Sequence, residues 1–273
     1  MTAMAISDWL LCNPRRDEPR VVALRRKMDD FYRTSTDYTA FHEPAVKSRE
    51  WAMMDAALDD IIASKGHARI LELGAGRTAY LQHVAARRPA IEFHCQDVTP
   101  VNADYLKHHA DRLHVGDIAD LDGEYDLIFS TYVLEHVCDP ERFLEHVDRL
   151  LAPSGWHFTF SPRYDSVFYV CPSLRHQLVR VQAAANVRMA LGRMTAAVMR
   201  APRFWINCDP AVLHAPWRRD ADAVHLVNRH AIETWHHQRG YSSQRLTQAS
   251  HSWKEWLLVR HLLLSNGFQK RPR

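Results

Sequence analysis

Glycine is scarce in this chain, and acidic residues are missing from one long segment. The sequence has 273 residues but only nine glycines, about half the share of an average protein. Hydrophobic residues make up 47% and charged residues 25%, a composition that is typical of globular proteins and excludes wholesale disorder. We therefore expect a folded chain whose few glycines stand where the backbone requires them.

Paired cysteines and long apolar runs are also lacking. The five cysteines are odd in number and none forms a C-x-x-C pair, so neither a zinc site nor a disulfide framework is indicated. No apolar run approaches the roughly 18 residues of a membrane-spanning helix. No basic stretch precedes the short N-terminal apolar patch, so we expect no signal peptide and a cytoplasmic location. A net charge of +3 is too small to indicate nucleic-acid binding.

From residue 68 onward, short apolar runs alternate with segments of helical spacing. We expect strands at residues 68–73, 91–95, 113–115, 125–130 and 156–162. The helix before the last of these is expected over 139–155, ended by Pro153-Ser154-Gly155. Short strands alternating with longer helices predict a parallel sheet. The expected fold is a Rossmann-like, doubly wound α/β domain with a helical N-terminal cap and a helical insertion after the fifth strand.

This pattern predicts a division of the chain into four parts. We expect a helical N-terminal cap or lid over 1–66, the Rossmann-like core over 67–163, the insertion over 164–222 and a C-terminal completion of the core over 223–273. Within the last part, the segment from Tyr241 predicts a sixth strand. The segment that follows it fits a strand and a helix equally well.

The segment that lacks acidic residues lies within the insertion. No Asp or Glu occurs from Ser166 to Cys208, whereas six arginines do, at positions 175, 180, 188, 193, 200 and 203. A segment with several arginines and no acidic residues suits the binding of an anionic small molecule. A solvated helical hairpin, a dimer surface and contact with an anionic membrane face are the other readings.

The sharpest motif is the segment ILELGAGRTAYL, where an apolar strand leads into Gly74-Ala75-Gly76 and then a helix. Glycines permit the tight turn and let a ligand approach bare backbone beside a helix N-terminus. Asp97 follows Gly76 by 21 residues, where a carboxylate can accept ribose hydroxyls. A dinucleotide site has the same pattern, but Glu72 suits a ligand that carries an ammonium group.

These residues, together with Gly116-Asp117-Ile118 and the stretch YDLIFSTYVLEHVCDPERFLEHVDRLLAPSGWHFTFSP, resemble the class I methyltransferases that use S-adenosylmethionine. The resemblance is to the small-molecule branch with a Leu-Glu-His signature after strand four. It covers residues 68–162, with a weaker echo at 222–241. Two departures are Thr78 in place of a third glycine and Gln96 just before Asp97.

The resemblance implies roles for eight residues. The methionine part of the cofactor would be held by Glu72, Gly74 and Gly76. Asp97 would bind the ribose, and the adenine would contact Val98, Asp117 and Ile118. Thr131 would line the methyl-donating face. His136, at the carboxyl edge of the sheet, is the candidate catalytic base. The alternative is that Glu135 and His136 only brace the turn after the strand.

Candidate substrate contacts are Tyr38, His42, Arg163 and His225. Tyr38 and His42 belong to an aromatic segment that would either close over the site or pack the N-terminal helices together. No metal is expected, because adjacent His236 and His237 diverge on a helix and lack a third ligand.

We expect a methyltransferase that acts on a small-molecule acceptor, at an oxygen of a sugar-like or natural-product compound that can be anionic. An NAD(P)-dependent oxidoreductase would use the same glycines and Asp97. A non-catalytic scaffold that binds the cofactor or a partner is the other alternative. A homodimer and peripheral membrane contact both stay open.

Overall fold

The computed structural model describes residues 6–34, 48–77, 80–84, 89–165, 169–213, 221–245 and 262–272. Two of the expected substrate contacts, Tyr38 and His42, lie outside these ranges. Within them, no helix is both long and apolar enough to cross a membrane.

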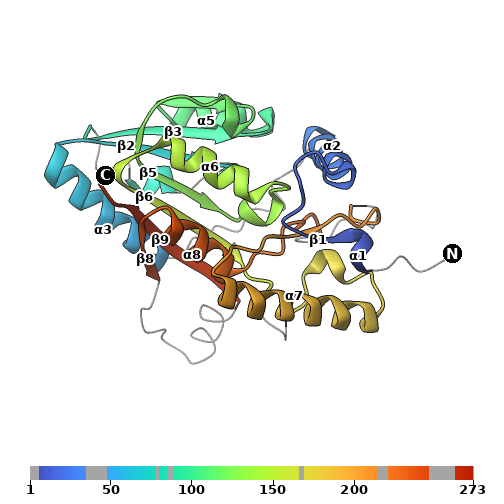
Figure 1. Ribbon diagram of the computed structural model, residues 1–273. Helices are drawn as coiled ribbons and strands as arrows, with labels where there is room; N and C mark the ends of the chain where they lie inside the picture. Colours follow the sequence, from blue (N-terminus) through green and yellow to red (C-terminus); the bar gives the residue numbers. More distant parts are fainter. Residues whose placement is uncertain are drawn as a thin grey trace.

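A seven-stranded sheet forms the centre of the molecule (Figure 1). Its strands, in spatial order, are β4 (Arg112–Val115), β3 (Ile91–Asp97), β2 (Ala68–Leu73), β5 (Tyr125–Thr131), β6 (Leu151–Pro162), β9 (Leu263–Lys270) and β8 (Tyr241–Arg245). The first five are parallel, and β9 runs antiparallel to both β6 and β8. The expected mostly parallel, Rossmann-like α/β fold is confirmed.

The chain order of the strands reverses at β2. Strands β3 and β4 extend the sheet on one side of β2, and β5 then pairs with its other side. In open α/β sheets, ligands bind at the carboxyl ends of the strands beside such a reversal. A binding site is therefore expected beyond the carboxyl ends of β2 and β5.

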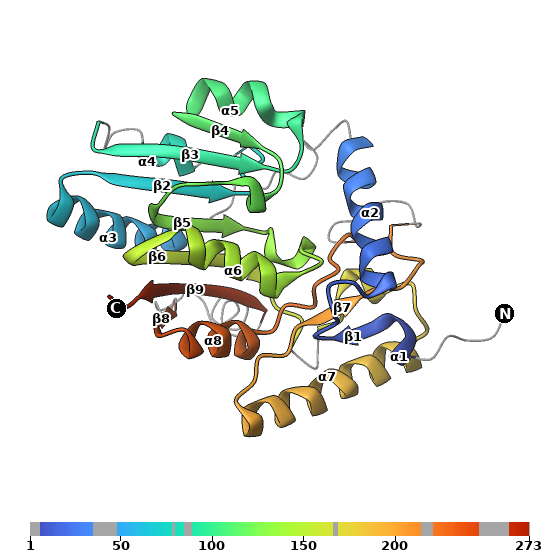
Figure 2. The same cartoon turned by 45° about the horizontal axis from the view of Figure 1, so that its top comes forward.

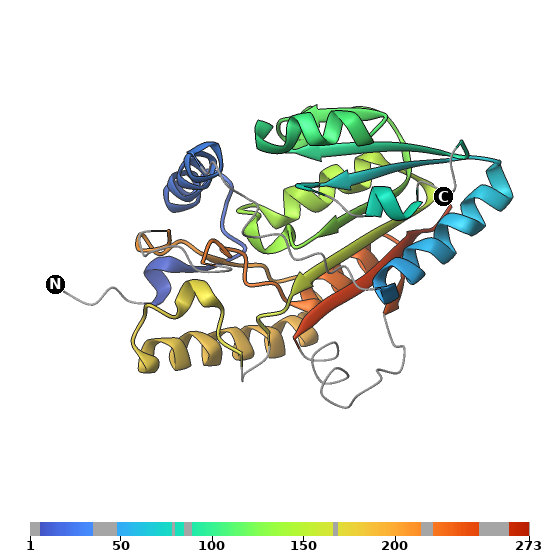
Figure 3. The same cartoon turned by 180° about the vertical axis from the view of Figure 1, so that it is seen from behind.

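Both faces of the sheet are apolar, because parallel strands are covered by helices on each side. On β2, Ile70 belongs to one buried cluster and Leu71 and Leu73 to another. Helices α3 (Ser48–Lys65) and α4 (Tyr80–Val84) cover the first face, as Figure 3 shows. Helices α6 (Pro140–Leu150) and α8 (Arg229–Gln238) cover the second. Helix α5 (Ala103–His109) joins β3 to β4.

One predicted boundary is wrong. The helix expected over 139–155 ends at Leu150, and β6 begins at the next residue. Leu151 already pairs with Tyr125 of β5, and Ser154 adopts a φ of 65°. Gly155 lies so close to its neighbours that an added Cβ would stand 3.0 Å from the carbonyl oxygen of Asp126. Pro-Ser-Gly thus forms an irregularity inside a strand rather than the end of a helix.

The N-terminal residues and the insertion form one unit. Strand β1 (Leu10–Cys12), which follows the short helix α1 (Ile6–Trp9), pairs antiparallel with β7 (Trp205–Asn207) of the insertion. Figure 2 shows this pair and helix α2 (Pro19–Thr34) beyond the carboxyl ends of the parallel strands, with helix α7 (Val179–Met199) along the outer side.

The domain boundaries stay a prediction. The segment expected as one helical cap contains the strand β1 as well. Its last helix, α3, buries Met54, Leu58 and Ile61 in the cluster that lies against the sheet.

Candidate active site

The glycine turn after β2 lies at the reversal point of the sheet. Gly74 and Gly76 adopt φ values of 60° and 53°, in the left-handed region that glycine enters most easily. A Cβ on Gly74 would stand 2.5 Å from a methyl group of Val133. The backbone at Gly74 therefore packs against the segment after β5, with no space for a side chain.

Gln96, which the sequence marked only as a departure, ties this turn to the next loop. Its Oε1 accepts a hydrogen bond from the N–H of Gly74 at 3.2 Å, and its Nε2 donates to the carbonyl of Gly116 at 2.6 Å. Its own backbone carbonyl accepts from Ala75 at 3.0 Å. One side chain thus fixes the spacing of two loops at the carboxyl edge.

Asp97 is buried at the end of β3, where its carboxylate organises the backbone around it. Oδ2 accepts from the N–H of Gly76 at 2.8 Å, and Oδ1 from the N–H of Thr99 at 3.0 Å. Burial raises the pKa of Asp97, while these N–H groups oppose the rise. A carboxylate oxygen accepts more than one hydrogen bond, so these contacts leave capacity for ribose hydroxyls.

The loop after β4 presents the other expected cofactor residues. Ile118 is buried, whereas Val98, which follows β3, is 48% exposed. The exposed Asp117 caps the short turn Ile118–Asp120 by accepting from the N–H of Ala119 at 2.9 Å. An exposed Val98 beside an acid-capped turn suits a flat, partly apolar ring such as adenine.

Two expected residues lie on the central strands themselves. Glu72 is buried on β2, between Cys95 of β3 and Phe129 of β5 in the sheet register. Burial raises the pKa of the Cys95 thiol, and the charges of Glu72 and Asp97 raise it further. At the end of β5, the buried Oγ1 of Thr131 has no hydrogen-bond partner among the described residues. This hydroxyl and the glycine turn beside it fit a polar ligand at the edge of β2 and β5.

The Leu-Glu-His turn after β5 (Leu134–His136) is fastened to residues 222–225. The Nδ1 of His225 donates to the carbonyl of Leu134 at 2.9 Å. The N–H groups of Val224 and His225 donate to the carbonyl of Glu135 at 2.8 and 2.9 Å. The two stretches that the sequence connected only through a resemblance are therefore neighbours in space.

His136 stands at the open side of this turn, beside a second carboxylate. Its Nδ1 lies 3.3 Å from Oδ2 of Asp222 and 3.2 Å from the Asp222 carbonyl oxygen. The hydroxyl of Tyr32, on α2, donates to the same Oδ2 at 2.9 Å. On the other side of the ring, Nε2 lies 3.9 Å from Oε1 of Glu135. The sequence identified His136 but neither Asp222 nor the role of Tyr32.

The remaining candidates are placed less favourably for substrate contact. His225 is fully buried, and burial lowers its pKa to about 4. Arg163 forms a two-pronged ion pair with Asp165, with both N–O distances at 2.8 Å. Their roles in substrate binding, and those of Tyr38 and His42, stay predictions.

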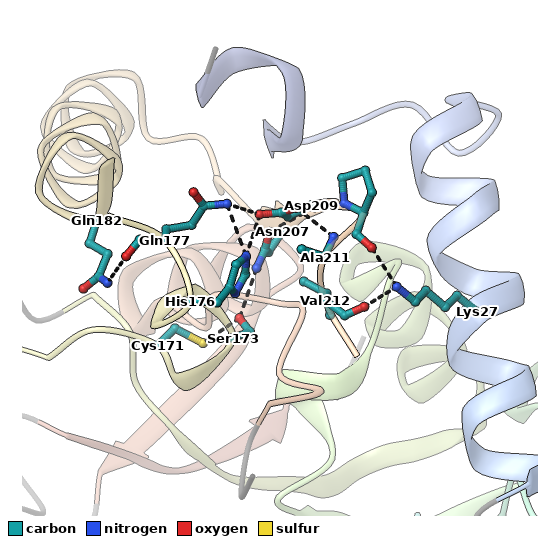
Figure 4. Close-up of polar contacts among 11 residues, drawn as sticks. Lys27, Cys171, Ser173, His176, Gln177, Gln182, Asn207, Asp209, Ala211 and Val212 are labelled. Atoms are coloured by element: carbon teal, nitrogen blue, oxygen red, sulfur yellow. Dashed lines mark hydrogen bonds and ion pairs between the residues drawn. The ribbon is translucent and has the colours of Figure 1, made fainter. Parts of the chain in front are cut away.

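A second polar cluster joins α2 to the insertion (Figure 4). His176 and Gln177 contact the carboxylate of Asp209, and Lys27 of α2 donates to the carbonyls of Pro210 and Val212. Although burial opposes it, the hydrogen bonds from Ala211, His176 and Gln177 hold the pKa of Asp209 below its usual range. The cluster holds α2, and with it Tyr32, over the carboxyl edge of the sheet.

The fold and the placement of these residues are those of a Rossmann-like ligand-binding domain. The family model described as "Methyltransferase domain" matches residues 46–245, which is more than half of the chain. The chain therefore belongs to this methyltransferase family, and it is an enzyme that depends on S-adenosylmethionine. A nicotinamide-dependent oxidoreductase, which would use the same glycines and Asp97, does not belong to this family.

Individual relatives are distant. An uncharacterized protein of Synechococcus sp. is 32% identical over 101 residues, which span 33% of this chain and 24% of that protein. The chain is similar to the 1,6-didemethyltoxoflavin-N1-methyltransferase of Burkholderia thailandensis, solved with 1,6-didemethyltoxoflavin and S-adenosylhomocysteine. That similarity has a TM-score of 0.51 at 14% identity and covers 94% of this chain and 92% of the other.

A further similarity is to the plantazolicin methyltransferase BpumL, solved with a pentazolic desmethylPZN analog and S-adenosylhomocysteine. Its TM-score is 0.49 at 12% identity, over 93% of this chain and 92% of the other. At such low identities the structures show a shared fold.

Proposed function

We propose that this enzyme transfers a methyl group to a hydroxyl oxygen of a small sugar-like or natural-product acceptor, including anionic ones, with His136 as the base. The observation that carries the proposal is the contact of His136 with Asp222 at the carboxyl edge of the sheet. The Leu-Glu-His turn then serves catalysis as well as bracing the chain after β5. S-adenosylmethionine supplies, when bound, an electrophilic methyl group on a sulfonium.

The residues expected to hold the cofactor are those around the glycine turn. The backbone of Gly74 and Gly76 with Glu72 would take the methionine part, whose ammonium group a buried carboxylate can neutralise. Asp97 would accept the ribose hydroxyls, and Val98, Asp117 and Ile118 would contact the adenine. Thr131 would line the face toward the acceptor.

His136 is oriented for proton transfer. Both Asp222 atoms near Nδ1 are hydrogen-bond acceptors, so the neutral imidazole carries its proton on Nδ1 and has a lone pair on Nε2. Nε2 would accept the acceptor hydroxyl's proton as its oxygen gains the methyl group. The positive charge that then forms on the ring lies between the carboxylates of Asp222 and Glu135, which stabilise it.

The structurally similar toxoflavin enzyme is named as an N1-methyltransferase and was solved with the small molecule 1,6-didemethyltoxoflavin. It supports a small-molecule acceptor but not the choice of oxygen. We favour oxygen for this chain because a positioned base helps a hydroxyl more than an unprotonated amine, typically by about 10²- to 10⁴-fold.

The direct test is methyl transfer from labelled S-adenosylmethionine to a panel of alcohols, phenols, carboxylates and amines. The proposal expects labelled ethers from the alcohol or phenol group and a His136→Ala enzyme that binds S-adenosylhomocysteine normally but transfers methyl groups about 10²-fold more slowly or worse. Full turnover by the His136→Ala enzyme, or labelling of amines alone, would contradict it.

A further inference from the structure

Helix α7 carries most of the exposed large apolar side chains in the described part of the chain. Ten such side chains are exposed there, and seven of them lie between residues 178 and 199. These seven are Leu178, Val179, Val187, Leu191, Met194, Val198 and Met199, with exposed fractions between 58% and 86%. Apolar patches of this kind on a folded domain mark an interaction surface.

The opposite side of α7 is the one that packs on the protein. Its buried residues are the small or flexible Ala185, Met189, Gly192 and Ala196. A Cβ on Gly192 would stand 2.5 Å from the ring of Trp205, so the helix backbone rests directly on β7. Helix α7 lies along the outer side of the molecule (Figure 2). Val187, Leu191, Met194 and Val198 lie on the side of the helix opposite these buried residues.

The exposed face is wide. Val187, Leu191, Met194 and Val198 follow each other at steps of four, three and four residues, which places them on one line along the helix. Ala197, Val198 and Met199 are all exposed, and three consecutive residues cover about 200° of a helix at 100° each. A two-helix seam uses a much narrower stripe, so this face suits a broad apolar surface.

The charges around the face are mainly positive. Arg175 precedes α7, and Arg200 and Arg203 follow it. Arg180 lies in the first turn of α7, and the half-buried Arg188 and Arg193 lie along it, whereas no Asp or Glu occurs from Ser166 to Cys208. Helix α1, which contacts α7, contributes Asp8, a single charge against several arginines. The partner should therefore be anionic as well as apolar.

A second copy of the chain meets this requirement poorly. An antiparallel pair of α7 helices would bring Arg180 near the partner's Arg200, and a parallel pair would bring Arg180 near its own copy. Neither helix has an acid to neutralise these charges. A surface of anionic lipids supplies both the negative charge and an apolar layer that accepts side chains over the full helix, about 30 Å long.

We propose that α7 docks lengthwise on an anionic lipid surface, with its exposed aliphatic side chains in the boundary between headgroups and acyl chains and the flanking arginines on the lipid phosphates. The helix lies on the surface and does not cross it. This inference concerns where the enzyme binds and does not depend on the identity of the methyl acceptor.

The test is flotation of the full-length protein with vesicles of phosphatidylcholine, alone or mixed with phosphatidylglycerol. We expect flotation with the anionic vesicles that weakens as salt is added. Leu191→Ser/Met194→Ser should reduce it by about ten-fold or more, because two side chains lose their apolar contact. Arg175→Gln/Arg180→Gln should remove part of the salt-sensitive binding.

Controls separate docking from folding. Val101→Ser changes an exposed valine away from α7 and should float like the wild type. All variants should keep the thermal stabilisation by S-adenosylhomocysteine, which reports on the fold and the cofactor site. Absence of flotation, equal flotation with neutral vesicles, or a concentration-dependent dimer that Leu191→Ser/Met194→Ser abolishes would each overturn the proposal.

Discussion

The Nδ1 of His136 and the Oδ2 of Asp222 lie 3.3 Å apart, although 86 residues separate them in the chain. His136 follows strand β5, and Asp222 is the last residue of the expected insertion. Tyr32, from helix α2, donates to the same carboxylate oxygen at 2.9 Å. Three distant parts of the sequence thus meet around one imidazole ring.

Replacing Asp222 with Asn tests whether this contact serves catalysis. The amide keeps the size of the side chain but removes the charge that orients and stabilises the ring. We expect kcat to fall by about 10²-fold with little change in the KM for S-adenosylmethionine. Tyr32→Phe, which removes only the hydroxyl, should reduce kcat by less than about ten-fold. Wild-type kcat in Asp222→Asn would show that the carboxylate has only a structural role.

Replacing Gln96 tests the link between the two loops at the carboxyl edge. Gln96→Glu keeps the shape but removes the N–H that donates to Gly116, and it places an acceptor oxygen against that carbonyl. We expect the Kd for S-adenosylhomocysteine, measured by calorimetry, to rise by about ten-fold. Gln269→Glu is the matched control, because Gln269 is on β9 and donates only a long bond of 3.4 Å to Ser154. Equal affinities in the two variants would contradict a bracing role for Gln96.

The sequence predicted the parallel part of the sheet because each strand is an apolar run bounded by turn residues. Gly74, Asp97 and His136 could be placed at the carboxyl edge because Gly74 follows β2, Asp97 ends β3 and His136 lies in the turn after β5. The end of the helix before β6 was placed wrongly, since Pro153 to Gly155 resemble a helix terminator locally. Pairing with β5 decides their conformation instead.

Asp222 and Gln96 could not be assigned from the sequence for a different reason. Asp222 lies in a stretch without regular structure, so periodicity says nothing about its neighbours. Gln96 acts through two backbone contacts, to Gly74 and Gly116, that exist only when β2, β3 and β4 are side by side. Contacts between segments far apart in sequence carry no local signal.

Gly74→Ala tests the close approach at the glycine turn. An alanine there adopts an unfavourable φ and meets a methyl group of Val133 at 2.5 Å. We expect lower thermal stability and at least about a ten-fold loss of affinity for S-adenosylhomocysteine. Gly66→Ala is the matched control, because Gly66 also has a positive φ but an added Cβ there meets nothing within 4 Å. It should cost only about 1 kcal/mol of stability and leave affinity unchanged.

The double variant Gly74→Ala/Val133→Ala separates the two causes. If the collision dominates, removing the valine side chain should restore part of the lost affinity. If the double variant binds no better than Gly74→Ala, backbone strain alone accounts for the loss, and the packing explanation is wrong.

Buried histidines should make the fold sensitive to acid. His157 on β6 donates from Nδ1 to Nε2 of His236 on α8 at 3.0 Å, and His236 donates to the carbonyl of Ile232. Burial lowers the pKa of His157 to about 3 and that of His225 to about 4, and it lowers the pKa of His236 well below 6.5. These side chains stay neutral in the folded protein at pH values where the unfolded chain binds protons.

Above about pH 6.5 these histidines therefore do not reduce the free energy of unfolding. Below that pH the free energy of unfolding falls as the pH drops toward 4. Each of the three groups contributes a slope of up to about 1.4 kcal/mol per pH unit. His157→Leu removes one titrating group, so its stability should fall less steeply than that of the wild type in urea unfolding between pH 7.5 and 5. His237→Gln, at an exposed position of α8, should keep the wild-type slope. Identical slopes in all three proteins would mean that the buried pair does not govern acid unfolding.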